Sequence, residues 1–294
     1  MKRIVSLTLA LLLALCALPF AFAETQDDTE AIPEDYGALG ILRKMNITAE
    51  ELNEILAEPL VELSYYDRFA DYDTVTSLIM ALNVGEIALI SVDGNTAKYI
   101  ASRNEHFVVR IPNDGDYMLG YSMLLRGKDR ELCERMSGII REMKGDGSME
   151  ALRKTYIDDV IAGNDPVEGI VPQSFEGADT IRVAVTGDRP PMDYIAPDGT
   201  PMGFNTALIA EIAKRLQINV ELVSFDSGAR AIALASGAAD VIFWSQGANF
   251  DNWSDADSED QPEGTVVTES YLSSPCRYVV LDSSPLADIL EPWE

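Results

Sequence analysis

The segment IRVAVTGDRPPMDYIAPDGTPMGFNTALIAEIAKRLQINVELV, residues 181–223, decides the fold. Its first five residues form an apolar, largely β-branched run, which predicts a buried strand at 181–185. A loop rich in glycine and proline follows, and apolar residues then recur at helical spacing over 204–216. A second apolar run predicts a strand at 220–225. A strand, a helix and a strand in this order indicate a parallel β-α-β unit.

The same alternation continues on both sides of this segment. Downstream we expect a helix at 229–236, a strand at 240–244, an acidic loop at 246–264 and a strand at 266–281. Upstream we expect helices at 74–82, 96–102, 129–144 and 149–161, and strands at 60–66, 87–92, 107–111 and 117–125. The fold class is therefore α/β.

A linker divides this pattern into two lobes. Residues 163–180 contain two prolines, three glycines and no sustained periodicity. We therefore expect a first α/β lobe at 36–162 and a second at 181–294. An acidic stretch without apolar periodicity, residues 24–35, predicts a flexible leader. The opening strand of the first lobe is not evident among residues 36–60.

Residues 1–23 have the pattern of a cleavable signal peptide. Lys2 and Arg3 precede an apolar run, and Ala21-Phe22-Ala23 provides small residues at the cleavage positions. The apolar run is shorter than the roughly 20 residues of a spanning helix. We expect an extracytoplasmic protein, periplasmic or secreted, with no membrane insertion after cleavage. Lipid anchoring through Cys16 is not expected, because a large residue precedes it.

The composition narrows the function classes. The chain has 49 acidic and 22 basic residues and a net charge of −27; signal cleavage removes two basic residues and leaves −29. Such a chain is repelled by nucleic acid and anionic lipid. The remaining cysteines, Cys133 and Cys276, are too few for a disulfide framework, and we expect both in the core. With His106 as the single histidine, a histidine-based metal site or triad is not expected, and no cofactor is expected.

The second half resembles a known family in several motifs. These are Pro190-Pro191, a D-G-x-x-x-G-F turn at 198–204 and S-G-x-x-D at 236–240. Together they are similar to the first lobe of extracytoplasmic solute-binding proteins of polar amino-acid ABC importers (family 3). The segment ESYLSSPCRYVVL, residues 269–281, resembles the strand that ends that lobe.

The first half resembles the family's other lobe. Residues 72–100 are similar to its helix, strand and aspartate-bearing turn, and residues 123–157 to its final strand and two helices. The lobes thus stand in reversed order, which indicates a circular permutation or a lobe exchange. The resemblance implies a periplasmic-binding-protein-like fold with a ligand cleft between two lobes that close by a hinge.

The resemblance also implies a function. It predicts binding of a small polar solute, an amino acid or related amine, and its delivery to the permease of an ABC importer by a monomer. The alternative is a ligand-sensing or degenerate binding module that is not coupled to transport. A few proteins of this fold are enzymes. We do not expect catalysis, because no pair of carboxylates can be placed in the cleft from the sequence.

Candidate ligand-binding residues follow from the matching positions. Asp93 stands where the family pairs an aspartate with the ligand's α-ammonium, and it is equally consistent with a helix cap. Trp244 and Ser245 follow the S-G-x-x-D motif, where relatives hold the ligand's carboxylate. Trp244 is also consistent with a cap on the sheet.

Three further candidates lie in loops. Arg189 stands where relatives carry an aromatic residue, and its guanidinium is suited to stacking or to an acidic ligand. A solvated loop charge is the other interpretation of Arg189. Asp188 and Ser227 are candidates at the rim of the cleft.

One departure from the family puts ordinary α-amino-acid binding in question. Relatives carry T-x-T-x-x-R after this strand, and its arginine clamps the carboxylate. Here residues 246–251 read QGANFD, and the next arginine is Arg277. The loop instead carries the acidic run Asp255, Asp257, Glu259 and Asp260. It faintly resembles a calcium loop, but the required glycine is missing, so a solvated loop is the preferred interpretation and no metal is expected.

Overall fold

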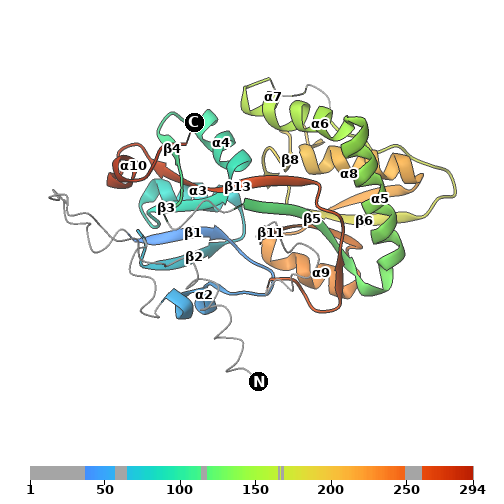
Figure 1. The fold of residues 1–294 in the computed structure, drawn as a ribbon, viewed down its shortest axis with the longest axis horizontal. Helices are drawn as coiled ribbons and strands as arrows, with labels where there is room; N and C mark the ends of the chain where they lie inside the picture. Colours follow the sequence, from blue (N-terminus) through green and yellow to red (C-terminus); the bar gives the residue numbers. More distant parts are fainter. Residues whose placement is uncertain are drawn as a thin grey trace, which may run out of the picture.

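The computed structural model describes residues 37–56, 65–113, 118–164, 166, 169–248 and 260–293 (Figure 1). The signal peptide predicted at 1–23, the leader at 24–35 and most of the strand predicted at 60–66 lie outside these residues. The strands are β1 (Ala38–Leu42), β2 (Arg68–Tyr72), β3 (Leu89–Asp93), β4 (Phe107–Arg110), β5 (Met118–Arg126), β6 (Thr180–Val185), β7 (Asp188–Arg189), β8 (Asp193–Ile195), β9 (Pro201–Met202), β10 (Asn219–Ser224), β11 (Val241–Ala248), β12 (Thr265–Val267) and β13 (Leu272–Leu281).

Helices connect most of these strands. The α-helices are α2 (Ala49–Leu56), α3 (Val75–Val84), α4 (Gly94–Arg103), α5 (Arg130–Asp146), α6 (Ser148–Arg153), α7 (Asp159–Ile161), α8 (Phe204–Leu216), α9 (Arg230–Ser236) and α10 (Pro285–Ile289). Two short 3₁₀ turns, η1 (Gly127–Asp129) and η3 (Ser227–Ala229), precede α5 and α9, and a π-helical turn, η2 (Lys154–Asp158), joins α6 to α7. The α/β class and its alternation of strands and helices are confirmed.

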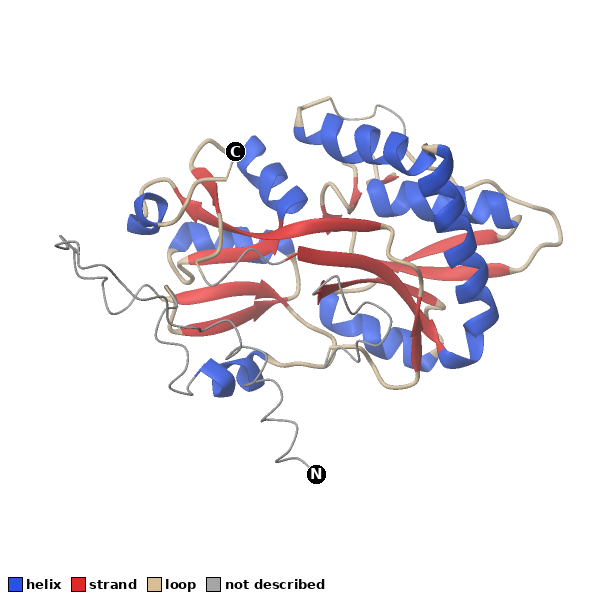
Figure 2. Ribbon diagram, viewed as in Figure 1, coloured by secondary structure: helices blue, strands red, loops and turns tan. Residues whose placement is uncertain are grey.

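Ten of the strands form two five-stranded layers of the same design, and β7, β8 and β9 form a separate three-stranded sheet. Figure 2 shows the strands with the helices around them. In one layer the order is β2-β1-β3-β13-β4, and β2, β1 and β3 are parallel. In the other layer the order is β10-β6-β11-β5-β12, and β10, β6 and β11 are parallel. In both layers the fourth strand runs antiparallel to the third. We refer to residues 37–113 and 276–293 as unit A, and to residues 118–275 as unit B.

The strands β5 and β13 join the two units. The first part of β13, Leu272 to Pro275, pairs antiparallel with Tyr121 to Met118 of β5. The rest of β13 then pairs with β3 and β4 of unit A. A single ten-stranded sheet therefore runs through both units, and this pair of strands forms its middle.

Helices cover both faces of each layer, and apolar clusters lie beneath them. In unit A, α3 and α4 pack on one face through residues such as Leu78 and Ile100, while α10 covers the other through Leu286. In unit B, α5, α6 and α8 share the larger core, which includes Met136 and Leu208, and α9 covers the opposite face. Such two-faced coverage explains why the central strands are continuous apolar runs.

These clusters correct the predicted domain boundaries. Residues 129–161 were assigned to the first lobe, yet α5 to α7 pack with α8 and β6 in unit B. Residues 276–293 were assigned to the second lobe, yet they complete the sheet and core of unit A. The physical reason is that β5 and β13 carry the chain from one unit to the other. Sequence order therefore does not follow spatial order, and the linker at 163–180 joins two parts of unit B.

Several other expectations need adjustment. The strand that the sequence left unassigned among residues 36–60 is β1, which lies inside the sheet of unit A. Cys133 is buried in the large core, as predicted. Cys276 is only half-buried, and its sulfur lies 3.1 Å from the Ser91 hydroxyl. Neither Cys133 nor Cys276 takes part in a disulfide within the described residues.

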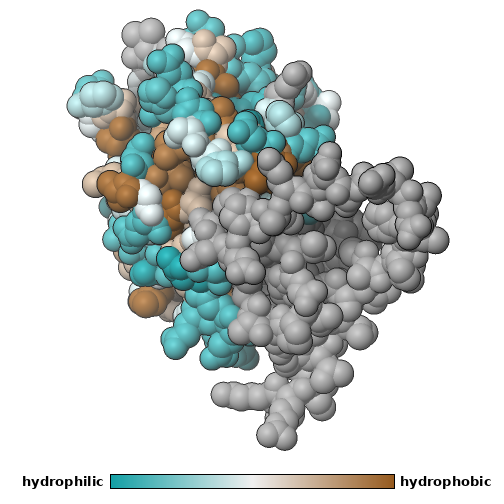
Figure 3. Space-filling view, turned by 90° about the vertical axis from the view of Figure 1, so that its left-hand side faces the viewer, coloured by the Kyte–Doolittle hydropathy of each residue, from teal (hydrophilic) through white to brown (hydrophobic). Residues whose placement is uncertain are grey.

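The outer surface of unit A is mixed in character. Figure 3 shows the molecule from this side, with hydrophilic residues interrupted by apolar patches. Met80 and Val84 on α3 and Ile289 on α10 are the large exposed apolar side chains of this unit among the described residues. No helix in the described ranges has the length and apolar character needed to cross a membrane.

Candidate functional site

The candidate site lies where the two units meet at the carboxyl ends of their parallel strands. Asp93 is the last residue of β3 in unit A, and the loop at residues 186–193 follows β6 in unit B. In open α/β sheets, ligands bind at these strand ends. The contact between Asp93 and this loop therefore joins the ligand-binding edges of both units.

Asp93 is completely buried, and its carboxylate has two tasks. Its Oδ1 accepts hydrogen bonds from the backbone N–H groups of Asn95 and Thr96, both at 3.1 Å, and thereby caps α4. Its Oδ2 accepts from the Thr96 hydroxyl at 2.6 Å and from Nη2 of Arg189 at 3.0 Å. The helix-cap interpretation of Asp93 is thus confirmed, and the same carboxylate also carries a cationic partner.

Arg189 reaches this carboxylate from the other unit. Its Nη2 also donates to the Tyr121 hydroxyl at 3.1 Å, and its guanidinium carbon lies 5.7 Å from the centre of the Tyr121 ring. Only 15% of the Arg189 side chain is exposed, so it is not a solvated loop charge. Its Nε is buried and has no hydrogen-bond partner among the described residues.

The charges of this pair stabilise each other. Burial disfavours the ionised form of Asp93, but the charge of Arg189 and the hydrogen bonds from Thr96 hold its pKa below the ordinary value. Burial likewise disfavours the Arg189 cation, but its interactions with Tyr121 and Asp93 raise its pKa. Burial, and next the charge of Asp93, raise the pKa of Tyr121 well above its usual value. The hydrogen bond of 3.0 Å between Arg189 and Asp93 and these pKa directions favour an ionised pair beside a protonated Tyr121.

Asp188 makes a second contact across the junction. The strand β7, which carries it, packs against α3 of unit A, and the backbone N–H groups of Thr76 and Val75 in the first turn of α3 act to lower the pKa of its carboxyl group. Its Oδ2 is buried without a hydrogen-bond partner among the described residues. Burial raises the pKa of Asp188 despite these amide donors. The structure thus brings together Asp93, Arg189 and Asp188 of the predicted site residues.

A buried aspartate that the sequence prediction missed holds the loop in place. Asp193, 3% exposed, accepts hydrogen bonds at Oδ1 from the backbone N–H of Thr186 at 2.7 Å and of Gly187 at 3.0 Å. Its Oδ2 accepts from the Asn205 side chain at 3.0 Å, and Asn205 in turn accepts from the Tyr271 hydroxyl at 3.1 Å. This network ties the loop to α8 and to the segment before β13.

The structure explains why the second glycine of the D-G-x-x-x-G-F turn, Gly203, is needed. Its φ is +104°, and a Cβ at this position would lie 2.5 Å from the carbonyl oxygen of Met192. The absence of a side chain lets the backbone of Phe204 and Asn205 donate to the carbonyls of Pro191 and Met192. The turn and the loop at 186–193 are therefore fastened to each other.

The other three predicted residues have different partners. Trp244 belongs to the apolar cluster beneath α9, and its Nε1 donates to Asp260 at 3.3 Å. Ser227 is buried in η3, where its carbonyl oxygen accepts from Nε of Arg230 at 3.3 Å. The backbone of Ser245 pairs with that of Tyr121 in the sheet, and its side chain lies outside the described part of the chain.

Asp260 corrects the expectation of a solvated acidic loop. It is 8% exposed, and its Oδ1 accepts hydrogen bonds from the backbone N–H groups of Met45 at 2.7 Å and Asn46 at 3.0 Å. These residues belong to unit A, so Asp260 links the two units beside Trp244. Asp255, Asp257 and Glu259 lie outside the described residues. Within the described part of the chain, no group of three or more His, Cys, Asp or Glu side chains could hold a metal ion.

Arg230 is a second buried arginine near the junction, and the sequence prediction missed it. Its Nη1 donates to the carbonyl oxygen of Phe243 at 2.7 Å. Burial, and next the charge of Arg189, lower its pKa. The strand after S-G-x-x-D thus lacks the family's arginine, while α9 supplies another one that is fastened to the backbone. Arg230, Tyr121, Asp193 and Asn205 carry no short-range motif that would have identified them.

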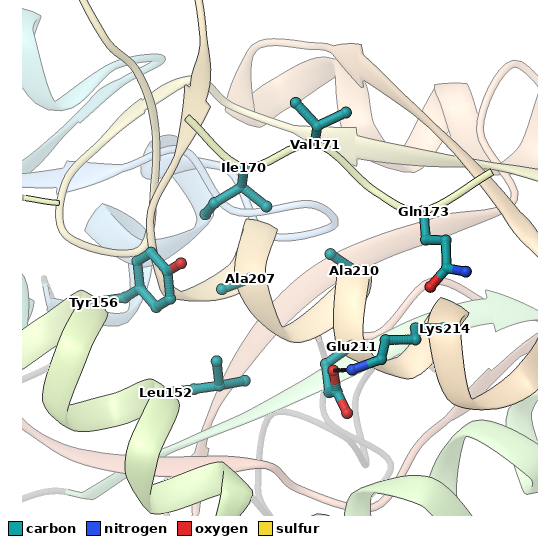
Figure 4. A pocket seen from close by; sticks show the side chains of 9 residues that line it. All are labelled: Leu152, Tyr156, Ile170, Val171, Gln173, Ala207, Ala210, Glu211 and Lys214. Atoms are coloured by element: carbon teal, nitrogen blue, oxygen red, sulfur yellow. Dashed lines mark hydrogen bonds and ion pairs between the residues drawn. The ribbon is translucent and has the colours of Figure 1, made fainter. Parts of the chain in front are cut away.

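A shallow groove of about 240 Å³ lies elsewhere in unit B (Figure 4). It runs between α6, α8 and residues 169–173, with Leu152, Ile170 and Ala207 among its apolar lining. Its charged residues, Lys214 and Glu211, pair with each other at 3.0 Å. No unpaired charge lines this groove, so the interlobe cluster remains the candidate site.

Comparison with known proteins supports the resemblance in part. The model of the family described as bacterial extracellular solute-binding proteins, family 3, matches residues 181–248. This range holds β6 to β11, including the loop with Asp188 and Arg189 and the turn with Gly203. No curated protein sequence matches the chain.

Several solved structures are similar to the chain at low sequence identity. The GluR0 ligand-binding core in complex with L-glutamate is 14% identical, with 85% of this chain and 86% of that chain covered and a TM-score of 0.39. Tv2483 bound to L-arginine is 15% identical, with 87% and 82% covered and a TM-score of 0.42. CbnR, a LysR family transcriptional regulator, is 11% identical, with 97% and 73% covered and a TM-score of 0.40. The chain is thus similar in part to extracellular solute-binding proteins.

Proposed function

We propose that this chain binds a small polar solute at the junction of its two units, outside the cytoplasmic membrane, and delivers it to an ABC permease. One observation carries the proposal. Two oppositely charged side chains, Asp93 and Arg189, come from different units and meet in a buried position at the strand ends. Charges are costly to bury, and such clusters gather at functional sites.

Unpartnered polar atoms at the same place support a ligand. Nε of Arg189 and Oδ2 of Asp188 are buried without hydrogen-bond partners among the described residues. Buried polar atoms are nearly always satisfied by protein, water or a bound molecule. A solute with both donors and acceptors, such as an amino acid or a related amine, matches this set. The family match over residues 181–248 supports the binding of a solute.

The proposal includes several expectations from the sequence. The chain is exported with signal cleavage after residue 23, acts as a monomer, and binds its solute without chemical conversion and without a cofactor. Its lobe order derives from a circular permutation. The path of the chain favours this origin, because α5 to α7 pack beside α8 and thus close to the start of β6.

A sensing module that is not coupled to transport is the second candidate. The observation that favours it is the sequence QGANFD at 246–251, which lacks the family's carboxylate-binding arginine. In that case the ligand would report to a partner protein and would not be handed to a permease. Uptake of the ligand by cells that lack this protein decides between the two candidates. A transport receptor is required for uptake, so these cells should lose it, whereas loss of a sensing module should leave uptake unchanged.

A thermal-shift panel of amino acids, amines and small peptides tests binding itself. A ligand of the folded state raises the melting temperature by mass action, and Asp93→Ala should abolish that rise. Asp198→Ala is the matched control, because Asp198 is an exposed aspartate that also holds a turn, through Thr200. Unchanged melting of the unmodified protein across the panel contradicts the proposal.

A further inference from the structure

We infer that the consecutive residues Asp188 and Arg189 form an intramolecular clasp that closes the junction in place of a bound ligand. Both residues lie on β7 of unit B, and both side chains engage unit A. Asp188 lies on the strand that packs against α3, and Arg189 donates to Asp93 at the first turn of α4. The clasp acts at the junction to which the proposed function assigns the solute.

Charge compensation explains why Arg189 favours closure. When the units meet, Asp93 is completely buried, and an unpaired buried carboxylate is strongly unfavourable. A ligand's ammonium is one way to supply the missing positive charge. Here the chain supplies it from its own loop, with a guanidinium 3.0 Å from the carboxylate. The closed arrangement therefore needs no solute.

The surroundings keep the clasp rigid. Asp193 fixes the loop that carries it through the backbone N–H groups of Thr186 and Gly187. Tyr121, on the strand that joins the units, receives the second hydrogen bond of Arg189 Nη2. A guanidinium held on both sides loses little further freedom when it pairs with Asp93. This preorganisation favours the internal partner over a free cation.

The clasp determines which solutes can enter. A cationic solute must displace Arg189 from Asp93 and leave that arginine without its partner. Amines and guanidinium compounds that carry no carboxylate for the displaced Arg189 should therefore bind the unmodified protein more weakly than an amino acid does. Removal of the Arg189 side chain should open the junction and create a site for such a cation between Asp93 and Tyr121.

Ligand-free experiments test the closure. Small-angle scattering should give a larger radius of gyration for Arg189→Ala than for the unmodified protein. Hydrogen exchange at the amides of Asn95 and Thr96 should become at least about tenfold faster. Arg103→Ala is the matched control, because Arg103 also crosses the junction but donates there to a backbone carbonyl oxygen, that of Val160, at 2.8 Å. This control should change neither quantity at the junction.

Chemical rescue tests whether the guanidinium group of Arg189 is what pairs with Asp93 and closes the junction. Millimolar ethylguanidinium should raise the melting temperature of Arg189→Ala and reverse its expansion, and it should do neither for the unmodified protein or for Arg103→Ala. If Arg189→Ala does not fold, Asp188→Ala tests the other half of the clasp, with faster exchange expected at Val75 and Thr76. Unchanged scattering and exchange in the folded variants overturn the inference.

The outcomes separate the clasp from the proposed function. If Arg189→Ala expands and the thermal-shift panel shows no ligand, the clasp is supported and solute binding is rejected. If the panel shows a ligand and Arg189→Ala does not expand, solute binding is supported and the clasp is rejected.

Discussion

Nη2 of Arg189 lies 3.0 Å from Oδ2 of Asp93, although 96 positions separate these residues in the chain. The two side chains are buried and form an ion pair with each other. Removing one member of such a pair leaves an uncompensated charge, while removing both does not. This relationship makes the effects of the two residues strongly coupled.

A double-mutant cycle should reveal this coupling. We expect Asp93→Asn and Arg189→Gln each to lower the free energy of unfolding by about 3–5 kcal/mol. The double variant should be more stable than the sum of the two losses predicts, because it buries no unpaired charge. Urea unfolding measures all four proteins. Strictly additive losses would show that the two residues act independently.

The same pair should make stability depend on acidity. The pKa of Asp93 is lower in the folded protein than in the unfolded chain, where it is about 3.9. Its stabilising contribution is therefore fully present above that value and is lost as pH falls through the folded-state pKa. We expect the difference in unfolding free energy between the unmodified protein and Asp93→Asn to stay constant from pH 7 to about 5 and to shrink as pH falls further toward about 3. A difference that stays constant over the whole of this range would contradict the ionised pair.

Asp193 should be essential for the order of the loop that carries the clasp. Asp193→Ala removes the acceptor of two backbone N–H groups and of the Asn205 side chain. The expected loss of stability is about 2–4 kcal/mol, because buried donors remain without partners. Hydrogen exchange at Thr186 and Gly187 should accelerate more than exchange in α5. Asp198→Ala, which alters an exposed turn, provides the comparison and should affect neither amide.

Two glycine substitutions should change the free energy of unfolding in opposite directions. Gly203→Ala should lower the free energy of unfolding by at least about 2 kcal/mol, because its Cβ would meet the Met192 carbonyl and its φ is positive. Gly138 lies within α5, where an added Cβ would meet no atom within 4 Å and where φ is not positive. Gly138→Ala should therefore raise the free energy of unfolding by about 0.5–1 kcal/mol, as in other helix interiors. Thermal unfolding of both variants checks the pair, and a stabilised Gly203→Ala would show that the turn has room to adapt.

The sequence predicted the regular elements well where periodicity was strong. The helix expected at 204–216 is α8 with the same bounds, and the strand at 181–185 differs from β6 by one residue. The short strands β1 and β2 were missed, because five-residue elements beside irregular segments carry little periodicity. The spatial division of the chain was also wrong, since nothing local in β5 or β13 reveals that they cross between units.

The candidate site could be predicted only in part. Asp93 and Arg189 were found because their positions match those of the family that the sequence resembles, but their pairing depends on the approach of two distant units. Tyr121 lies in an apolar strand, where one aromatic residue resembles any core residue. Asp193 was hidden in a loop where an exposed carboxylate is the ordinary expectation. Burial decided the role of each, and burial is a property of the assembled fold.

The path of the chain has a consequence for its biosynthesis. The sheet of unit A receives β13 between β3 and β4, yet β13 emerges from the ribosome about 160 residues after β4 in a chain of 294 residues. Unit B, whose strands and helices are nearly contiguous, can assemble first. Until the last segment arrives, β3 exposes an unpaired edge, which is a hazard for aggregation. The proposed export, in which the chain crosses a membrane unfolded, is compatible with this order, because the step that completes unit A comes last.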